Sequence, residues 1–568
     1  MVNGHYSQAR PVVSATAICS KPANLRPAKR VGTIQRPRRS KPHCMFQPAS
    51  AADLLGAARS LLTGRGAYLV VLIIALGVSL TAIYVHGAPV PHIHDEFTYL
   101  FAGETYANFR LSNPSPPSPA SFWSPHLLVE PSFASKYPPA QGLVLAIGDW
   151  FGNPLIGLLL SGVLAAIALL WALRAFVGRM PALVATIAFA GSALYLGVWI
   201  RTYMGGFVAF ACASLVLGFC LRLHRHSPTK LAYLATGIGM AGLFLSRPFE
   251  GAIVCLLAAL AYASQGLRQW RANRSGVARG ALIAALPLVL AFSFQAAINH
   301  AVTGSVWRMP HSEFHAQYMT QPIFIWQQPQ PALKPSVALT AGEDALIEKG
   351  DWLQHVRASI SGERAAASAV GGLALPWWVL LSLPFLALLE WRLLIVLSGF
   401  PLLHALSNYL QLHFYFGPIA PVWFLSISAM FEIIRRQAAL RPASAVLMIL
   451  VPASLALPGF METPSTHGYR HHHDLTRALA QRPPSLVFVR YGATANPHLA
   501  VVYNDPLLRN HSLFVNDLND AANCAVLNAF PGRELWRAVI EEDGIQAAIT
   551  EPSALCTPGS DTVHRETK

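Results

Sequence analysis

The stretch His94-Asp95-Glu96 sets two adjacent carboxylates directly after the first long apolar run of the chain. Only 12% of the 568 residues are charged and 53% are hydrophobic, so acids at the edge of an apolar segment need a chemical reason. A carboxylate can deprotonate or orient an acceptor hydroxyl, and Asp95 is our first candidate for such a base. Glu96 could orient Asp95, share a divalent cation with it, or raise its pKa by like-charge repulsion. Alternatively, both acids only complement the dipole of a helix that runs to about Phe109.

A transfer reaction with a phosphate leaving group also needs cations, and Lys136 is the first candidate. It precedes Tyr137-Pro138-Pro139, and proline at this position favours the start of a helix. The N-terminus of that helix and Lys136 together would suit a lipid phosphate. In the alternative interpretation, Lys136 anchors the helix to lipid headgroups.

Two arginines at the edges of other apolar runs are further candidates for holding the phosphate. Arg247 shares a tight turn with Glu250, and it could clamp a phosphate with two hydrogen bonds or pair with Glu250 as a structural bridge. Arg201 could bind phosphate or reach to the membrane interface. The histidines at 471 to 473 indicate a solvated loop rather than a metal site. The residues expected to support these groups or the acceptor are His94, Tyr137 and Glu250.

The elements that must hold these residues are membrane spans. A mean hydropathy of +0.41 and repeated apolar runs are typical of a polytopic membrane protein and exclude a single soluble core. The net charge of +15 does not indicate a nucleic-acid partner, because the basic residues lie mainly in the N-terminal tail and in turns. Since a span needs about 20 apolar residues, we predict about eleven transmembrane helices. They lie near residues 67 to 86, 154 to 174, 181 to 200, 203 to 221, 231 to 246, 249 to 264, 278 to 298, 371 to 389, 392 to 410, 413 to 434 and 443 to 459.

The short apolar segment from Pro138 to Phe151 decides the topology. If it spans, three basic turns fall on the side opposite the basic N-terminal tail, against the positive-inside rule. If it is an interfacial amphipathic helix, every strongly basic turn joins the N-terminus in the cytoplasm. We therefore expect residues 87 to 153, 299 to 370 and 460 to 568 on the outer side, where all the candidate site residues also fall.

The regions outside the spans have distinct compositions. Residues 1 to 66 are basic and proline-rich, which predicts a disordered cytoplasmic tail. Residues 67 to 459 form the transmembrane catalytic domain, with an ordered lid at 299 to 370. Residues 460 to 568 contain β-like runs at 485 to 489 and 499 to 503, which predict a small extracytoplasmic α/β region. Cys524 and Cys556 could form a disulfide there.

These features resemble the GT-C superfamily of integral-membrane glycosyltransferases, in particular its protein O-mannosyltransferases, aminoarabinose transferases and lipopolysaccharide-core transferases. The resemblance rests on Asp95-Glu96 after the first span, on Lys136-Tyr137-Pro138-Pro139 and on the many-span layout, and it covers about residues 67 to 460. It implies a polyprenyl-phosphate sugar donor and an inverting single displacement on the outer face. It also implies that Asp95 is the base, Glu96 the second acid, Lys136 a ligand of the donor phosphate and Arg247 a second cation.

The chain departs from the mannosyltransferases in one loop, because residues 299 to 370 are too short for their β-trefoil insertion. A protein acceptor is therefore not supported, and we expect a hexosyl- or pentosyltransferase of the bacterial inner membrane with a lipid or glycan acceptor. The sequence indicates no cofactor beyond the cation that Asp95 and Glu96 could share. Two alternatives are an envelope glycolipid transporter or flippase, which would carry ionisable residues at mid-membrane, and an O-antigen ligase or polymerase, which lacks the acidic pair.

Overall fold

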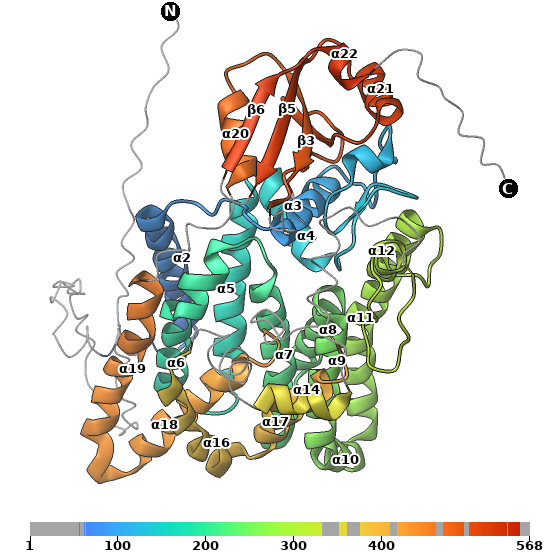
Figure 1. Cartoon of the computed structure of the whole chain (residues 1–568). Helices are drawn as coiled ribbons and strands as arrows, with labels where there is room; N and C mark the ends of the chain where they lie inside the picture. The colour runs from blue at the N-terminus through green and yellow to red at the C-terminus, as the bar shows by residue number, and fades with distance from the viewer. Residues whose placement is uncertain are drawn as a thin grey trace, which may run out of the picture. The chain divides into compact units, whose positions relative to one another are not determined.

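The computed structural model describes residues 64–331, 351–360, 375–408, 417–461, 470–492, 499–541 and 544–556, together with Gly56 and Leu62. Its contacts divide the chain into two compact units, Met1–Leu54 and Leu55–Lys568. The first unit, and with it most of the predicted tail, lies outside the described residues. In the second unit, helices dominate the chain up to residue 461 and a small sheet follows (Figure 1).

Six helices of the described ranges are long and apolar enough to cross a membrane, and one bent pair would make a seventh span. The six are α2 (Gly66–His86), α5 (Pro154–Leu173), α6 (Arg179–Gly191) with its continuation through η2 (Leu194–Val198) and η3 (Trp199–Arg201), α7 (Gly206–Arg225), α11 (Arg274–Thr303) and α19 (Arg441–Met461). The pair bent by 61° is α9 (Pro248–Ala261) with α10 (Ala263–Ala272).

The other predicted spans are shorter helices. They are α8 (Lys230–Ser246), η5 (Trp377–Ser382) with α16 (Leu383–Glu390), α17 (Arg392–His404) and α18 (Pro421–Arg436). Each of the eleven apolar runs therefore contains a helix within its described residues, which confirms the predicted class: a helical membrane protein with a small α/β region. The number of runs that reach spanning length is smaller than eleven. Residues 421–432 of α18 are all buried, so protein surrounds this helix.

Close helix contacts fix the position of the segment that decided the topology. Residues 138 to 151 were predicted to form a helix that lies in the membrane interface, and they contain α4 (Ala140–Trp150). Its 11 residues extend only about 16 Å, which is too short to cross a bilayer. A Cβ on Gly157 of α5 would lie 2.0 Å from the Val144 carbonyl oxygen, so only glycine lets α4 lie this close to α5. The helix itself is confirmed, whereas its depth in the membrane stays a prediction.

A layer of short elements covers one end of the bundle. It contains α3 (His94–Ala107), η1 (Pro119–Phe122), the hairpin β1 (Leu127–Leu128) and β2 (Ala134–Ser135), α4 and α12 (Pro310–Tyr318). A shared apolar cluster joins these elements: it includes Phe101 of α3, Leu128 of β1 and Phe314 of α12. The layer holds the candidate catalytic residues in fixed positions. A further short helix, α14 (Trp352–Ile360), lies against α17.

The C-terminal region is a four-stranded sheet with the order β4-β3-β5-β6. Its strands are β3 (Ser485–Tyr491), β4 (Ser512–Asn516), β5 (Glu534–Glu541) and β6 (Gly544–Ile549), and its helices are α20 (His471–Leu479), α21 (Asp520–Ala529) and α22 (Pro552–Leu555). β3 pairs in parallel with β4 and β5, and β6 is antiparallel to β5. The predicted strand at 485 to 489 and the α/β character of this region are confirmed. The histidine run begins helix α20, so its prediction as a loop was wrong.

The second predicted strand, at 499 to 503, was also wrong. Its apolar residues are buried, as predicted, but they pack in the core without joining the sheet. The Tyr503 amide donates to the Val501 carbonyl two residues earlier, which turns the backbone sharply. Asn504 then exchanges two side-chain hydrogen bonds with the backbone of Phe514, at the edge of β4 where another strand would pair. The Asn504 side chain thus makes the backbone hydrogen bonds that a further strand beside β4 would make.

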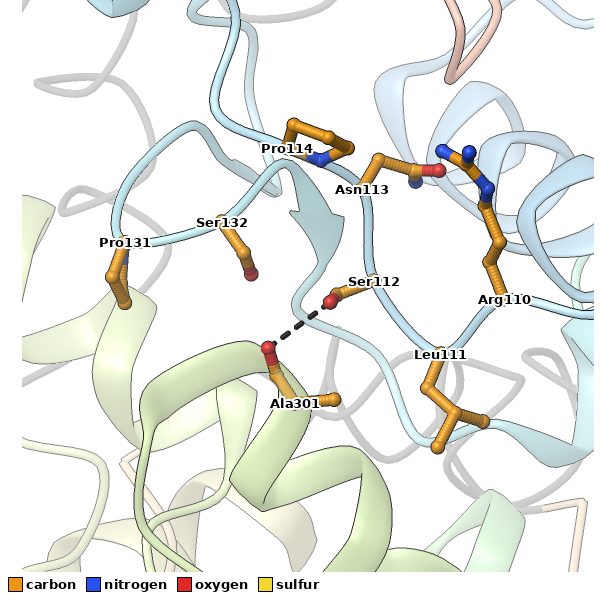
Figure 2. Close-up of a pocket in the computed structure, with 8 residues that line it drawn as sticks. All are labelled: Arg110, Leu111, Ser112, Asn113, Pro114, Pro131, Ser132 and Ala301. Atoms are coloured by element: carbon orange, nitrogen blue, oxygen red, sulfur yellow. Dashed lines mark hydrogen bonds between the residues drawn. The ribbon is translucent and has the colours of Figure 1, made fainter.

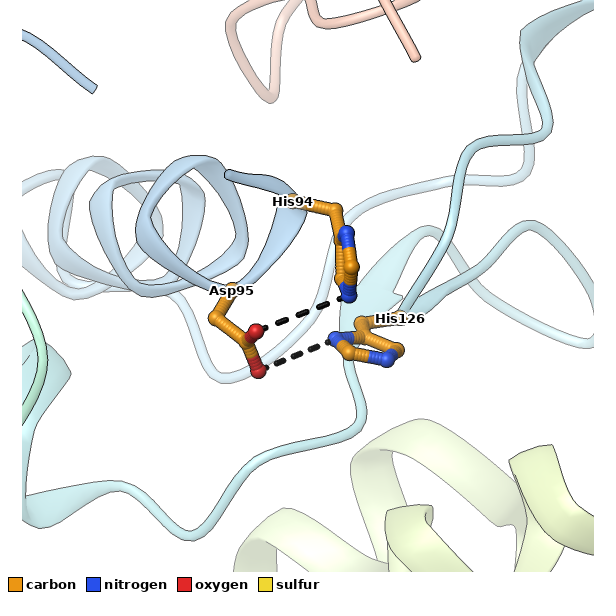
Figure 3. A group of neighbouring side chains, drawn as sticks. All are labelled: His94, Asp95 and His126. Carbon is orange, nitrogen blue, oxygen red and sulfur yellow. Dashed lines mark ion pairs between the residues drawn. The ribbon is translucent and has the colours of Figure 1, made fainter. Parts of the chain in front are cut away.

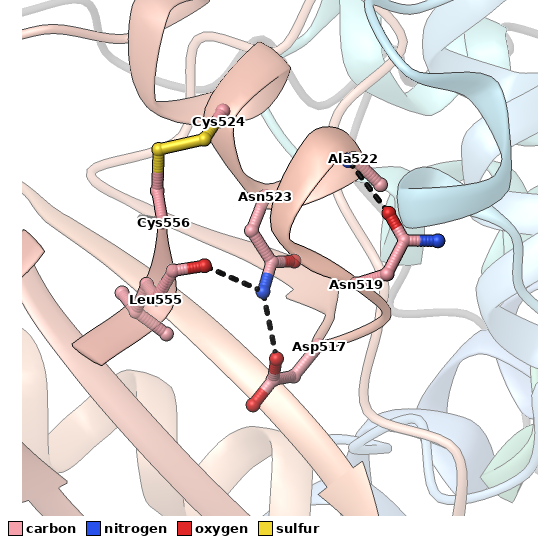
Figure 4. The surroundings of a disulfide bond; sticks show 7 residues. All are labelled: Asp517, Asn519, Ala522, Asn523, Cys524, Leu555 and Cys556. Carbon is pink, nitrogen blue, oxygen red and sulfur yellow. Dashed lines mark hydrogen bonds between the residues drawn. A yellow bond between two sulfur atoms is a disulfide. The ribbon is translucent and has the colours of Figure 1, made fainter. Parts of the chain in front are cut away.

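Cys524 and Cys556 form a disulfide, with 5.1 Å between their Cα atoms (Figure 4). The bond joins α21 to the residue that follows α22, and the neighbouring Asn523 amide donates to the Leu555 carbonyl. Closing a loop of this length stabilises a fold by about 4 kcal/mol in the chain-entropy model. The disulfide that the sequence allowed is therefore present in the C-terminal region.

Candidate active site

Asp95 lies in the first turn of α3, and two histidines flank its carboxylate. His94 Nε2 lies 3.5 Å from Oδ2, and His126 Nδ1 lies 3.3 Å from Oδ1 (Figure 3). The two imidazole rings meet edge to face, with 4.4 Å between centroids. His94 is buried, whereas the Asp95 side chain keeps 18% of its surface exposed. The Asp95 side chain is therefore not fully enclosed by protein.

Tyr137 completes the arrangement around Asp95. Its hydroxyl donates to Asp95 Oδ1 and lies 2.6 Å from His126 Nδ1. Burial raises the pKa of Asp95, but the positive charges of His126 and His94 outweigh burial, and hydrogen bonds from His126 and Tyr137 add to their effect. The net result is a pKa well below the ordinary value. Asp95 is therefore an ionised carboxylate held in one orientation.

Glu96 points to the other side of α3, because adjacent helical residues do not face the same direction. Its side chain is fully buried, and its two oxygens accept hydrogen bonds from the backbone amides of Tyr203 and His92, both 3.1 Å long. The His92 ring lies 3.3 Å away. Burial raises the pKa of Glu96. These contacts attach the start of α3 to the segment before α7, and they do not turn Glu96 towards the carboxylate of Asp95.

Lys136 is a buried cation at the end of the β1–β2 hairpin. Only 5% of the residue is exposed. Its ammonium lies 4.3 Å from the centroid of the Phe314 ring and 5.5 Å from that of Tyr137, which is within the range of cation–π attraction. The backbone amide of Lys136 donates a hydrogen bond to the His126 carbonyl across the hairpin. Lys136 and Asp95 therefore lie at the same tyrosine, one beside the ring and the other at the hydroxyl.

Arg247 and Glu250 adjoin this group from α9. Tyr99 connects the two sides, because its ring stacks on Tyr137 with 4.5 Å between centroids, and the charges of Arg247, Asp95 and Glu250 all act on its hydroxyl. Glu250 is itself buried, with Oε1 3.5 Å from His404 Nε2 of α17. The second predicted cation is thus within electrostatic reach of the Asp95 site.

Arg201 lies on the other side of α3. It is half-buried at the end of η3, two residues before the Tyr203 amide that binds Glu96. The described structure therefore associates Arg201 with the Glu96 side of the helix. Its predicted role at the donor phosphate stays a prediction.

Sequence reasoning did not select His126, Tyr99 or Phe314. The signal for His126 was present: an apolar triplet at 127 to 129 and an apolar pair at 133 and 134 flank Glu130-Pro131-Ser132, a pattern that predicts a hairpin. A hairpin sets the residue before one strand opposite the residue after the other, and here these are His126 and Lys136. The contacts of Tyr99 and Phe314 depend on helix packing, and no local pattern marks them.

The nitrogen and oxygen atoms at Asp95 also fit a metal ion. One ligand atom each from His94, Asp95 and His126 lies within 4.8 Å of the others. Two imidazoles and one carboxylate are a ligand set that suits zinc and other divalent transition metals. A cation shared by Asp95 and Glu96 was predicted from the sequence, whereas the structure groups Asp95 with His94 and His126.

A comparison with solved structures finds ArnT from Cupriavidus metallidurans. The apo structure aligns with a TM-score of 0.50 and 15% identity over 84% of this chain and 93% of that chain. The same protein bound to undecaprenyl phosphate gives a TM-score of 0.49 with the same identity and coverage. The oligosaccharyltransferase AglB from Archaeoglobus fulgidus, in complex with an inhibitory peptide and a dolichol-phosphate, gives 0.40 at 13% identity, over 83% of this chain and 69% of that chain.

The comparison confirms the fold that the sequence resemblance implied. The chain has the fold of the apo ArnT structure. No protein-family model matches the sequence. No curated protein matches it either.

Proposed function

We propose that this protein is a glycosyltransferase that moves a sugar from a polyprenyl phosphate to a lipid or glycan acceptor at the membrane face where α3 begins. The observation that carries the proposal is the ionised, partly exposed Asp95, held by His126 and Tyr137 with the buried Lys136 beside the same tyrosine ring. The shared fold supports it, because ArnT has been crystallised with undecaprenyl phosphate.

The proposed reaction is a single displacement with inversion. The oxygen of the acceptor hydroxyl bonds to the anomeric carbon of the sugar, and Asp95 accepts the proton of that hydroxyl. The bond from the anomeric carbon to the phosphate oxygen breaks. A carboxylate with a low pKa is a weak base, so the proton moves late, when bond formation has made the hydroxyl acidic. The departing polyprenyl phosphate gains negative charge, which Lys136 and Arg247 would stabilise.

Three residues would act through Asp95. His126 and His94 keep its carboxylate ionised, and Tyr137 fixes its orientation by donating to Oδ1. With both imidazoles neutral, His94, Asp95 and His126 would instead hold a divalent cation, which would supply positive charge in place of the two imidazolium groups. Glu96 would position α3 through Tyr203, without contact to substrate.

The membrane orientation belongs to the same proposal. We infer that the N-terminus is cytoplasmic, and that the Asp95 face and the C-terminal region lie outside the cytoplasm in a bacterial inner membrane. Two observations support this orientation: the basic turns fall on one side by the positive-inside rule, and a disulfide such as Cys524–Cys556 persists in oxidising compartments.

Transfer of labelled sugar tests the proposal directly. The full chain in lipid nanodiscs is mixed with undecaprenyl-phosphate sugars labelled in the hexose or pentose, and with membrane glycolipid extracts as acceptor. Wild type should transfer label, Asp95→Asn should lose at least about 100-fold in rate, and Lys136→Met should weaken use of the donor. Asp520→Asn, an exposed acid at the start of α21, is the matched control.

Two outcomes would overturn the proposal. Full activity of folded Asp95→Asn would remove its base. Movement of labelled glycolipid between leaflets of proteoliposomes, with no new glycosidic bond, would instead favour the transporter or flippase alternative. Impermeant thiol labelling of His92→Cys separates the two orientations, because the proposal requires labelling in right-side-out vesicles.

A further inference from the structure

A cavity of about 430 Å³ opens on the side of α12 away from the buried core of the site. One wall consists of Ser312, His315 and Ala316 of α12 with Met319 just after it, and the rest consists of residues 320 to 323, Gln327, Gln328 and Gln330. Its volume lies within the range of small-molecule sites, about 300 to 1,000 Å³. All its lining residues belong to the described part of the outer loop.

Contacts of neighbouring residues connect the cavity walls to the elements that carry the two predicted cations of the site. On one side, α12 places Phe314 over the Lys136 ammonium, at 4.3 Å from the ring centroid. On the other side, the cavity wall at Pro322 and Ile323 is joined to the end of α17, because the Asn408 amide donates to the Pro322 carbonyl. The adjoining Phe324 contacts Phe249, two residues after Arg247, with 5.1 Å between ring centroids.

The chemistry of the lining selects one class of ligand. Four glutamines (Gln321, Gln327, Gln328, Gln330), together with Ser312 and Thr320, offer amide and hydroxyl groups that both donate and accept hydrogen bonds. The lining contains no Lys, Arg, Asp or Glu, and His315 is its one titratable side chain, so it holds no permanent charge that would match a phosphate or an amino sugar. It is also too polar for an acyl chain. Met319 and Ile323 add the small apolar surface that the face of a sugar ring requires.

We propose that this cavity is the acceptor subsite and that it binds an uncharged sugar ring of an acceptor glycan. The inference rests on the proposed function and narrows its acceptor from a lipid or glycan to a neutral glycan. The sugar of the donor has the same chemistry, but the donor phosphate would lie at Lys136, on the other face of α12 from the cavity. The acceptor hydroxyl would then approach Asp95 past the end of α12.

Photo-crosslinking tests the subsite without knowledge of the natural acceptor. Octyl β-D-glucopyranoside that carries a diazirine on the sugar is irradiated with the full chain in nanodiscs, and labelled peptides are identified by mass spectrometry. Label should fall within residues 310 to 331, and methyl glucoside or methyl galactoside should compete. Gln328→Leu and Gln330→Leu, both exposed at the cavity, should each reduce label at least threefold. Gln437→Leu, an exposed glutamine after α18, should not reduce it.

Two further readouts separate failure of the subsite from failure of the proposed function. In the transfer assay, Gln328→Leu should raise KM for the glycan acceptor at least threefold and leave KM for the polyprenyl-phosphate donor unchanged. A rise confined to the donor KM, or label spread evenly over the protein, would overturn the acceptor subsite. Transfer of sugar by wild type in the same assay would still support the proposed function. Absence of any transfer alongside specific label would overturn the proposed function and the acceptor role.

Discussion

The two ends of helix α3 carry acids in opposite electrostatic environments. At the N-terminal end, His126 and His94 outweigh burial and hold the pKa of Asp95 well below its ordinary value. At the C-terminal end, burial and the neighbouring acids Asp505 and Asp149 raise the pKa of Glu104 to about 7. Burial also raises the pKa of Asp149 to about 6.

This contrast shows that burial does not by itself decide whether an acid is ionised. The helix dipole favours a negative charge at the start of α3 and disfavours one at its end, and the neighbouring residues strengthen both effects. Cations and hydrogen-bond donors surround Asp95, so its carboxylate is ionised. Acids surround Glu104, so its carboxyl stays partly protonated near neutral pH.

A cavity other than the one beside α12 adjoins the C-terminal end of α3. It measures about 470 Å³, and the segment Arg110 to Pro114 lines it together with Pro131, Ser132 and Ala301 (Figure 2). Ser112 holds this segment to α11 by donating to the Ala301 carbonyl. About 20 Å of helix separates the cavity from Asp95, because α3 has 14 residues. Size alone therefore does not identify the site: only the N-terminal end joins a carboxylate to cations.

The largest expected effect distinguishes the two ends by activity. Asp95→Asn should reduce transfer by about 100- to 10,000-fold, because it removes the base. Glu104→Gln should stay within about threefold of wild type. Both changes replace a carboxylate by an amide of equal size, so initial rates measured on folded protein report the charge alone. Comparable losses in the two variants would show that α3 acts as a unit and that its N-terminal end has no special role.

The next effect concerns the pH profile. His126→Phe removes the positive charge that lowers the pKa of Asp95, so that pKa should rise towards its ordinary value. Asp95 would then be protonated at a higher pH, and the acidic limb of the pH–rate profile should shift to higher pH. The rate at neutral pH should fall by about 10- to 100-fold, because Asp95 also loses a hydrogen bond. An unmoved acidic limb in rate measurements between pH 4 and 8 would contradict the assignment of His126.

These two residues also show what the sequence could predict. Asp95 follows the first span, and its position was evident from hydropathy and motif alone. The helical class and the C-terminal sheet followed from composition and periodicity in the same way. His126 lies 31 positions further on, and its contact with Asp95 depends on how a hairpin packs against α3. The prediction of a strand at 499 to 503 was wrong for a similar reason. The apolar residues of this segment indicate burial, but they do not specify a strand with which it pairs.

A smaller effect concerns stability at the C-terminal end. Glu104 has a raised pKa in the folded protein, so between its ordinary value of 4.5 and about 7 the folded state binds more protons than the unfolded state. Stability should therefore fall as pH rises through this window. Glu104→Gln should remove that fall and stabilise the protein at pH 8 by about 2 kcal/mol.

Thermal unfolding of the purified protein between pH 5 and 8 measures this effect. Tm of wild type should decrease with pH more steeply than Tm of Glu104→Gln. Glu551→Gln, an exposed acid before α22, should follow the wild-type curve. A wild-type Tm that increases over this range would contradict the repulsion between Glu104, Asp149 and Asp505.

The smallest effect concerns the contact between the C-terminal region and the N-terminal end of α3. Phe97 stacks on Tyr503 with 3.9 Å between centroids and meets His472 edge to face at 4.9 Å. Phe97 is two residues beyond Asp95, so this contact should help to orient the turn that carries the base. A double-mutant cycle with Phe97→Ala and Tyr503→Ala should give a coupling of about 1 kcal/mol in kcat/KM.

The other end of α3 supplies the matched control for this cycle. Phe109, just beyond the helix, stacks on Trp150 of α4 with 5.4 Å between centroids, and both rings are exposed. Phe109→Ala and Trp150→Ala should couple in Tm but not in kcat/KM, because the pair is remote from Asp95. Equal coupling of both pairs in kcat/KM would mean that any aromatic contact of α3 supports activity equally. Coupling confined to Phe97 and Tyr503 would instead indicate that the C-terminal region positions the catalytic turn.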